Sequence, residues 1–172
     1  MTTATRVSID EYLQTSYHPD VEYLDGELKQ KPVVTLAHGE VQAFLSVWFY
    51  EHRKEWVIRF AVETRTQVDP EHVRLPDFVV VFAGNREKGA LTRPPLIAIE
   101  VLSPTDSYKD LKRSAADLET MGVRNIWLID PDARTGEVWE RGSWRNGETT
   151  RLQAVDSPMF LDLDWLWQQM DE

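Results

Sequence analysis

The sequence contains no cysteine among its 172 residues. This absence excludes disulfide bonds, cysteine-ligated zinc, iron–sulfur clusters and thiol catalysis. No apolar run is long enough to cross a membrane, and residues Met1 to Arg6 lack the apolar segment of a secretion signal. We therefore expect a cytoplasmic protein with no membrane partner.

Basic residues are scarce, because 19 Lys and Arg stand against 29 Asp and Glu, a formal charge of −10. Nonspecific affinity for nucleic acids comes mainly from cationic side chains that replace counterions. The acidic excess lies at the two ends of the chain, since residues 41–129 hold 12 bases and 12 acids. The total charge therefore does not exclude DNA as a partner, but it predicts weak, salt-sensitive and metal-dependent binding.

The length, the 42% hydrophobic content and the lack of a Gly- or Ser-rich linker indicate one folded domain over residues 1–172. Apolar spacing and turn residues predict an α/β (α+β) sheet flanked by helices. The predicted elements are a helix between Ser8 and Pro19, a hairpin turning at Asp25-Gly26, a helix over 37–54, β-structure over 56–68, strands over 78–82, 96–102 and 125–129, a helix over 106–121, an edge strand over 137–140, and a loop with a short helix over 160–167.

Two acids stand in apolar surroundings where water is scarce. Asp77 directly precedes the strand Phe78-Val-Val-Val-Phe82, and Glu100 lies within the apolar segment 96–102. A buried carboxylate must be protonated, paired with a cation or bound to a metal. A salt bridge is the plain alternative, and its candidate partners are Arg74, Arg93 and Arg124. Two such acids on consecutive strands favour a hard cation with oxygen ligands, with Mg²⁺ as the first candidate.

Five ordered motifs carry a resemblance to a known family. They are Glu22-Tyr-Leu-Asp-Gly-Glu-Leu28 with His38 at the start of the first long helix, Pro76-Asp77 before an apolar strand, Ile99-Glu100-Val101-Leu102-Ser103-Pro104, Gly122-Val123, and Trp127-Leu-Ile-Asp130-Pro131. This set resembles the Uma-type restriction endonuclease family of the PD-(D/E)xK nuclease superfamily, from about Ser8 to Trp167. The resemblance implies a restriction-endonuclease-like fold with a central mixed sheet flanked by helices.

The resemblance also implies a role for each matched residue. Asp77 and Glu100 would bind Mg²⁺, or Mn²⁺ as a substitute, together with the backbone carbonyl of Val101. Glu22 would be a further catalytic acid near the metal, and His38 would bind a substrate phosphate or contact a carboxylate. The alternatives are that Glu22 is a hairpin acid that accepts from a nearby backbone group and that His38 is satisfied locally at its helix start.

The sequence departs from the superfamily pattern at the lysine. The pattern continues Glu-x-Lys, where this chain has Leu102, and relatives with the lysine on the next helix have it where this chain has Ser114. Lys112 and Arg113 are the nearby candidates for the missing cation. On a helix they lie about 200° and about 100° around the axis from Ser114, so a solvated basic face is the competing interpretation for both.

The sequence thus predicts an Mg²⁺-dependent endonuclease that hydrolyses DNA phosphodiester bonds. The missing lysine motivates an alternative, a catalytically weakened relative that serves as a nucleic-acid-binding or protein-interaction module. A third interpretation is a structural dimer in which Asp77 and Glu100 are only salt-bridged. DNA is the expected partner, and a second copy of the chain, forming a homodimer, is a further expectation.

Overall fold

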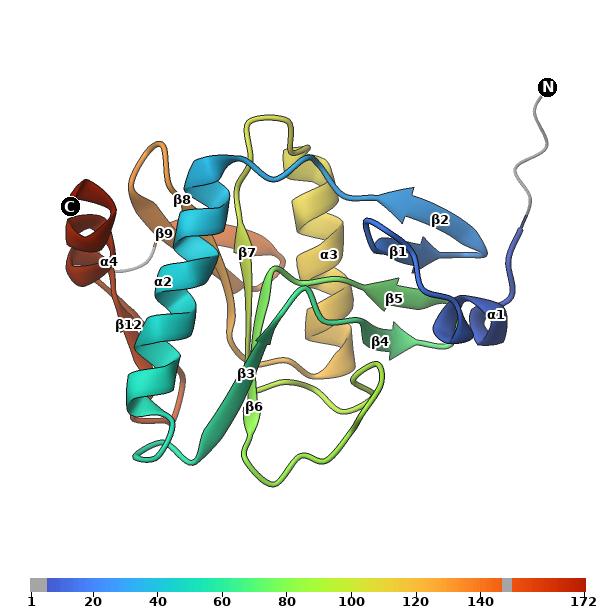
Figure 1. Ribbon diagram of the computed structural model, residues 1–172, viewed down its shortest axis with the longest axis horizontal. Helices are drawn as coiled ribbons and strands as arrows, with labels where there is room; N and C mark the ends of the chain where they lie inside the picture. The colour runs from blue at the N-terminus through green and yellow to red at the C-terminus, as the bar shows by residue number, and fades with distance from the viewer. Residues whose placement is uncertain (1–5, 147–149) are drawn as a thin grey trace.

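The computed structural model describes residues 6–146 and 150–172, and its centre is a six-stranded sheet (Figure 1). The strand order is β10-β9-β8-β7-β6-β3. The strands are β3 (Ile58–Val62), β6 (Phe78–Phe82), β7 (Ile97–Val101), β8 (Ile126–Asp130), β9 (Thr135–Glu140) and β10 (Ser143–Asn146). Only β7 and β8 pair in parallel within this sheet, so it is mixed, and the predicted fold class is confirmed.

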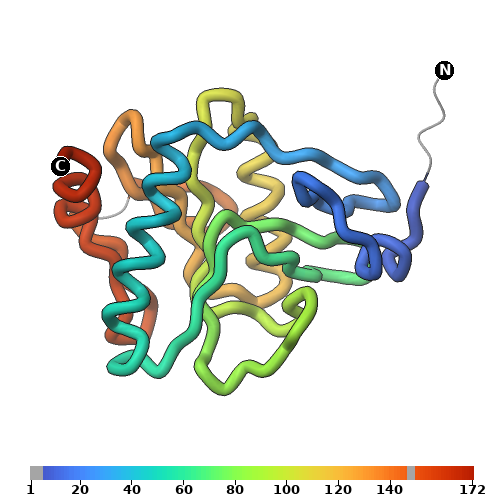
Figure 2. Tube along the Cα trace, viewed as in Figure 1, coloured from blue at the N-terminus to red at the C-terminus, as the bar shows by residue number. Residues whose placement is uncertain are grey.

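Helices cover both faces of the central sheet. The chain leaves β7, forms helix α3 (Tyr108–Met121) on one face and returns as β8, which is the crossover that a parallel pair requires. Helices α2 (Leu36–His52) and α4 (Leu163–Asp171) pack together on the other side, as the trace in Figure 2 shows. Side chains alternate along β7, because Ile97, Ile99 and Val101 join the α2 core while Ala98 joins the α3 core.

A second, antiparallel sheet lies beside the first and has the order β2-β1-β5-β4. Its strands are β1 (Val21–Leu24), β2 (Glu27–Gln30), β4 (Thr66–Asp69) and β5 (His72–Arg74). Asp25 and Gly26 have φ angles of 52° and 85°, so the predicted tight hairpin turn between β1 and β2 is confirmed. This turn sets the register that places Glu22 opposite Lys29.

The predicted helices are confirmed, with small shifts at their ends. Helix α1 (Ile9–Gln14) begins after Ser8, whose hydroxyl accepts from the Glu11 N–H at 3.2 Å. Helix α3 ends at Gly122, whose φ of 109° is the left-handed cap that the glycine predicts. In the described part of the chain, no helix combines the length and apolarity needed to cross a bilayer.

Four short strands were not predicted, and two predictions were wrong. β9 is not an edge strand, because β10 pairs with it on the outer side. The segment before α4 is not a loop but β12 (Phe160–Asp162), which pairs with β11 (Arg151–Gln153). β5 lies between the predicted elements that end at 68 and begin at 78. Each missed strand has three or four residues, which is too few for periodicity to identify.

Candidate active site

The register of the central sheet brings Asp77 and Glu100 together. β6 and β7 are antiparallel with Phe78 opposite Ile99, so one further step places Asp77 opposite Glu100. Residues directly opposite in such a pair have Cβ atoms about 5 Å apart and point to the same face. Both carboxylates are buried, with exposed fractions of 2% and 3%. The two acids singled out in the sequence therefore form one buried pair.

Asp77 is held by three donors. Its Oδ1 lies 2.5 Å from the Lys31 Nζ, and its Oδ2 accepts from the Val101 backbone N–H at 2.7 Å and lies 3.2 Å from His38 Nε2. Burial alone would raise the pKa of Asp77, but the charge of Lys31 and the contact with His38 outweigh it and hold the pKa below its usual value. Asp77 is therefore ionised at neutral pH.

Glu100 is held less tightly than Asp77. Its Oε1 accepts from the Ser114 hydroxyl at 3.1 Å, and its Oε2 lies 3.6 Å from the Lys31 Nζ, beyond hydrogen-bond distance. Burial raises the pKa of Glu100, and the neighbouring charges of Asp77 and Glu22 raise it further despite Lys31. The pair therefore has one carboxylate that stays ionised and one that is costly to ionise without an added cation.

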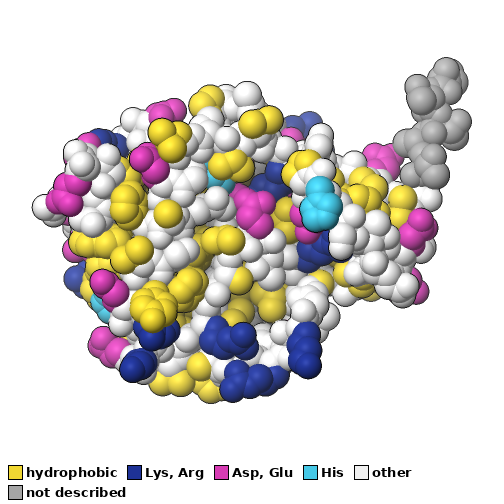
Figure 3. Space-filling view, viewed as in Figure 1, with side chains coloured by type: hydrophobic (Ala, Val, Ile, Leu, Met, Phe, Trp, Pro, Cys, Tyr) yellow, Lys and Arg dark blue, Asp and Glu magenta, His cyan; other side chains and the backbone are white. Residues whose placement is uncertain are grey.

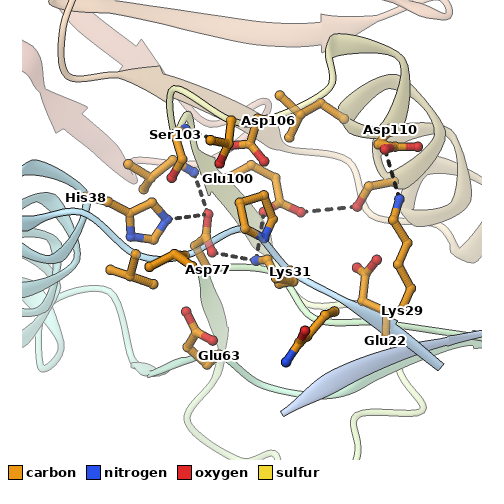
Figure 4. Close-up of a pocket in the computed structure, with 18 of the residues that line it drawn as sticks. Glu22, Lys29, Lys31, His38, Glu63, Asp77, Glu100, Ser103, Asp106 and Asp110 are labelled. Carbon is orange, nitrogen blue, oxygen red and sulfur yellow. Dashed lines mark hydrogen bonds and ion pairs between the residues drawn. The ribbon is translucent and has the colours of Figure 1, made fainter. Parts of the chain in front are cut away.

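These side chains line a cavity of about 730 Å³ (Figure 4). The cavity lies among the β1–β2 hairpin, the segment that leads into α2, the strand ends that carry Asp77 and Glu100, and the first turns of α3. In Figure 3 it is the hollow between α2 and the hairpin where acidic, basic and histidine colours meet. Seven of its lining residues are Asp or Glu and three are Lys or Arg, so the cavity attracts cations.

Glu22 lies in this cavity but is occupied by other partners. Its Oε2 lies 3.2 Å from the Arg74 guanidinium, and its Oε1 accepts from the Leu75 N–H at 3.2 Å. Arg74 also pairs with Asp117 at 2.6 Å. The alternative expected for Glu22, that it accepts a hydrogen bond from a nearby backbone group, is therefore observed. A catalytic role for Glu22 stays a prediction.

His38 lies where the motifs place it, at the start of α2, but it contacts a carboxylate rather than open space. It is 3% exposed, and its Nε2 reaches Asp77 while its buried Nδ1 has no hydrogen-bond partner in the described residues. Of the two roles expected for it, the contact with a carboxylate is the one present. His38 also lines the cavity, beside Asp77 (Figure 4), and binding of a substrate phosphate by His38 stays a prediction.

Lys112 and Arg113 are not brought to the acid pair, which corrects their interpretation as candidates for the missing cation. Both are exposed and line a shallow hollow on the outer side of α3 beside Trp139. Ser114 is the residue of this helix that faces Glu100, and neighbours on a helix point about 100° and 200° away from it. The solvated basic face is the arrangement observed.

Lys31 is the residue at the acid pair that sequence reasoning missed. The expected salt-bridge partners are engaged elsewhere: Arg74 pairs with Glu22, Arg93 with Glu87, and Arg124 with Asp156. Lys31 follows β2 and lies two residues beyond Lys29, the cross-strand partner of Glu22. Glu22 and Lys29 are cross-strand partners and point to the same side of their sheet, and Lys31 lines the same cavity.

The acid pair suits a hard divalent cation. One cationic group, the Lys31 ammonium, lies within 3.6 Å of both carboxylates, so the two side chains can share a positive ion. Carboxylate oxygens are the ligands that Mg²⁺ and Mn²⁺ prefer. No cluster of three or more His, Cys, Asp or Glu that could hold a metal by itself exists in the described residues. The Val101 N–H serves Asp77, and a ligand role for its carbonyl stays a prediction.

Comparison with known proteins supports the family resemblance that the sequence motifs indicate. A family model described as "Uma2: Putative restriction endonuclease" matches residues 9–168, which is most of the chain. A crystal structure of "a putative nuclease belonging to DUF820" from Anabaena variabilis is similar with a TM-score of 0.76 and 24% identity, over 94% of this chain and 98% of that one. At this identity the likeness shows the fold.

Other comparisons add little. A cryo-EM structure of a DrdV–DNA complex aligns with a TM-score of 0.40 and 15% identity, over 76% of this chain and 11% of that one, and a likeness this low carries no argument. No curated protein matches the chain. Because the family model covers most of the chain, the chain belongs to the Uma2 family, whose description is "Putative restriction endonuclease".

Proposed function

We propose that this Uma2 family member is an Mg²⁺-dependent endonuclease that hydrolyses phosphodiester bonds in DNA. The observation that carries the proposal is the buried Asp77–Glu100 pair, which meets one cationic group at the wall of a large cavity. A structural salt bridge needs one cation for one acid. Here two acids converge, and burial with like charge raises the pKa of Glu100, so the pair lacks positive charge that a divalent ion would supply.

Each residue of the site has a task in this reaction. Asp77 and Glu100 would hold the ion, which when bound polarises the phosphoryl group and lowers the pKa of the attacking water. The Val101 N–H and His38 fix Asp77 from behind, and the Ser114 hydroxyl fixes Glu100. Groups positioned in this way need not reorganise during the reaction, which favours a rapid chemical step.

Surface charge supports DNA as the substrate. Three arginines gather at the end of β6 away from Asp77: Arg59 donates to the Asn85 carbonyl at 2.9 Å, Arg93 to the Asn85 side chain at 3.1 Å, and Arg86 contacts the Ala83 carbonyl at 2.6 Å. Figure 3 shows Lys and Arg side chains gathering there, on the face where the cavity opens. The five residues of β6 span about 17 Å, the rise of about five base pairs.

Plasmid cleavage tests the proposal. Supercoiled plasmid and single-stranded DNA are incubated with the protein in Mg²⁺, Mn²⁺ or EDTA, alongside Asp77→Asn and Glu100→Gln. We expect nicking that needs the metal and is lost in both variants. Nicking that persists in both would show that the acid pair is not the active site. DNA retention without cleavage, with Mn²⁺ binding that both variants lose, would favour the binding-module alternative that the lysine-free positions Leu102 and Ser114 suggest.

The arginine cluster gives a second measurement. Replacing Arg59, Arg86 and Arg93 together by Glu should weaken plasmid binding and lower the slope of log affinity against log salt by up to about 3. The same variant should hydrolyse bis(4-nitrophenyl) phosphate at the wild-type rate, because this small diester does not reach the cluster. An unchanged salt slope would show that DNA docks elsewhere.

A further inference from the structure

Lys31 is the one Lys or Arg that forms an ion pair with either acid of the pair, among the residues that the structure describes. Its ammonium has three neighbours: Asp77 Oδ1 at 2.5 Å, the Leu75 carbonyl at 2.7 Å, and Glu100 Oε2 at 3.6 Å. The first two distances are hydrogen bonds and the third is not. One N–H of the ammonium is therefore not committed to a close protein acceptor.

Lys31 also stands closer to the open cavity than the acids do. Its side chain is 22% exposed, against 3% for Asp77 and 4% for Glu100. Figure 4 shows its ammonium beside the two carboxylates, on the segment that follows β2. A phosphate that enters the cavity would thus meet the ammonium next to the acids.

We propose that Lys31 is a catalytic residue, whose ammonium contacts the non-bridging oxygens of the scissile phosphate. The assignment rests on the proposed nuclease function and names a residue that acts in it. Its charge is needed because the phosphodiester is an anion that must approach two carboxylates. The opposite wall offers Glu100 only the neutral Ser114 hydroxyl, which cannot supply that charge.

The chemical step balances with Lys31 as a charge stabiliser. The oxygen of a water molecule bonds to phosphorus, and the bond from phosphorus to the leaving sugar oxygen breaks. The water gives one proton to solvent and the sugar oxygen takes one from solvent, so Lys31 keeps its own protons throughout. Positioned donors of this kind contribute about 100-fold to 1,000-fold to rate when they face charge that develops in the transition state.

The absence of cysteine makes a chemical test available. In Lys31→Cys the new thiol is the sole thiol of the chain. Alkylation with 2-bromoethylamine joins the sulfur to an aminoethyl group as bromide leaves, which restores an ammonium of nearly lysine length. Alkylation with iodoacetamide adds a neutral group of similar size. Lys54→Cys, at an exposed position after α2, is treated in the same way as the matched control.

We expect unmodified and carbamidomethylated Lys31→Cys to cut plasmid at least about 100-fold more slowly than the wild type in Mg²⁺, and the aminoethylated protein to regain most of that loss. Mn²⁺ binding, measured by calorimetry, should be as tight as in the wild type or tighter, because the ammonium no longer competes for Asp77. All forms of Lys54→Cys should cut at the wild-type rate.

Three results would overturn the assignment. Unmodified Lys31→Cys that cuts within about threefold of the wild type would show that the charge is not needed. Aminoethylated Lys31→Cys that has wild-type thermal stability but regains no cleavage would show that the ammonium is not what the variant lacks. Weakened Mn²⁺ binding in Lys31→Cys would show that Lys31 acts by holding the carboxylates. A wild type that cuts with no metal would instead overturn the proposed function, and this assignment with it, so the two failures are distinguishable.

Discussion

Metal affinity should rise steeply with pH because of Glu100. Burial, with the charges of Asp77 and Glu22, raises the pKa of this carboxyl from 4.5 to about 8 despite Lys31. A divalent ion binds the ionised form, so each binding event near neutral pH must release the Glu100 proton. Asp77 contributes no such dependence there, because its pKa is lowered and it is already ionised.

The magnitude follows from the linkage of proton release to binding. Below the raised pKa the observed affinity should increase about tenfold per pH unit, or about 1.4 kcal/mol, and level off above it. The stability of the metal-free protein has the opposite trend: the Glu100 contribution is fully present below pH 4.5 and is lost as pH rises through about 8. Mg²⁺ should therefore raise the melting temperature more at pH 7.5 than at pH 6.

Calorimetry with Mn²⁺ between pH 6 and 7.5, in two buffers of different ionisation enthalpy, checks this directly. We expect about one proton released per ion bound at pH 6.5. Glu100→Gln, which has no proton to release, should bind Mn²⁺ weakly and with no comparable pH dependence. Wild-type affinity that is flat over this range, with no proton released, would refute the reasoning by showing that Glu100 is already ionised or does not bind the ion.

Two further predictions concern stability. Arg74→Met should lower the free energy of unfolding by about 3 kcal/mol in chemical denaturation, because Glu22 loses its buried partner. Arg59→Met, at an exposed position, should change it by less than about 0.5 kcal/mol. Equal effects of the two substitutions would contradict a stabilising role for the buried ion pair. Gly122→Ala should lower the free energy of unfolding by about 1 kcal/mol, since φ is 109° and the added Cβ would lie 3.3 Å from Pro94. In the control Gly89→Ala the added Cβ meets no atom within 4 Å, so stability should not change. Unchanged stability in Gly122→Ala would exclude strain at this cap.

Local signals predicted most of the fold. The Ser8 cap, the Asp25-Gly26 turn and the Gly122 cap each act through neighbours a few residues away, so their sequence is sufficient to place them. The apolar run of β6 identifies a strand without knowledge of its partners. The short strands β5, β10, β11 and β12 have only three or four residues each, so their sequences show too little periodicity to identify them.

The acid pair was predictable for a related reason. A carboxylate inside an apolar segment is costly unless it has a partner, so Asp77 and Glu100 stand out in the sequence itself. Their direct opposition follows from the β6–β7 register. Lys31, the cation that pairs with them, cannot be identified from the sequence in this way. A lysine after a hairpin resembles any solvated surface lysine, and Lys31 is 46 residues from Asp77 in sequence.

The β1–β2 hairpin brings Lys31 to the site. The two-residue turn at Asp25-Gly26 pairs Glu22 with Lys29, which fixes the side to which both point. Lys31 lies two residues beyond Lys29, just after β2, and its ammonium contacts the Leu75 carbonyl and Asp77 at the start of β6. Ser114 is the α3 residue that contacts Glu100, whereas Lys31 approaches the same pair from the segment that follows the hairpin. A serine on α3 is therefore compatible with a charged site, because the two elements enclose the same pair of carboxylates.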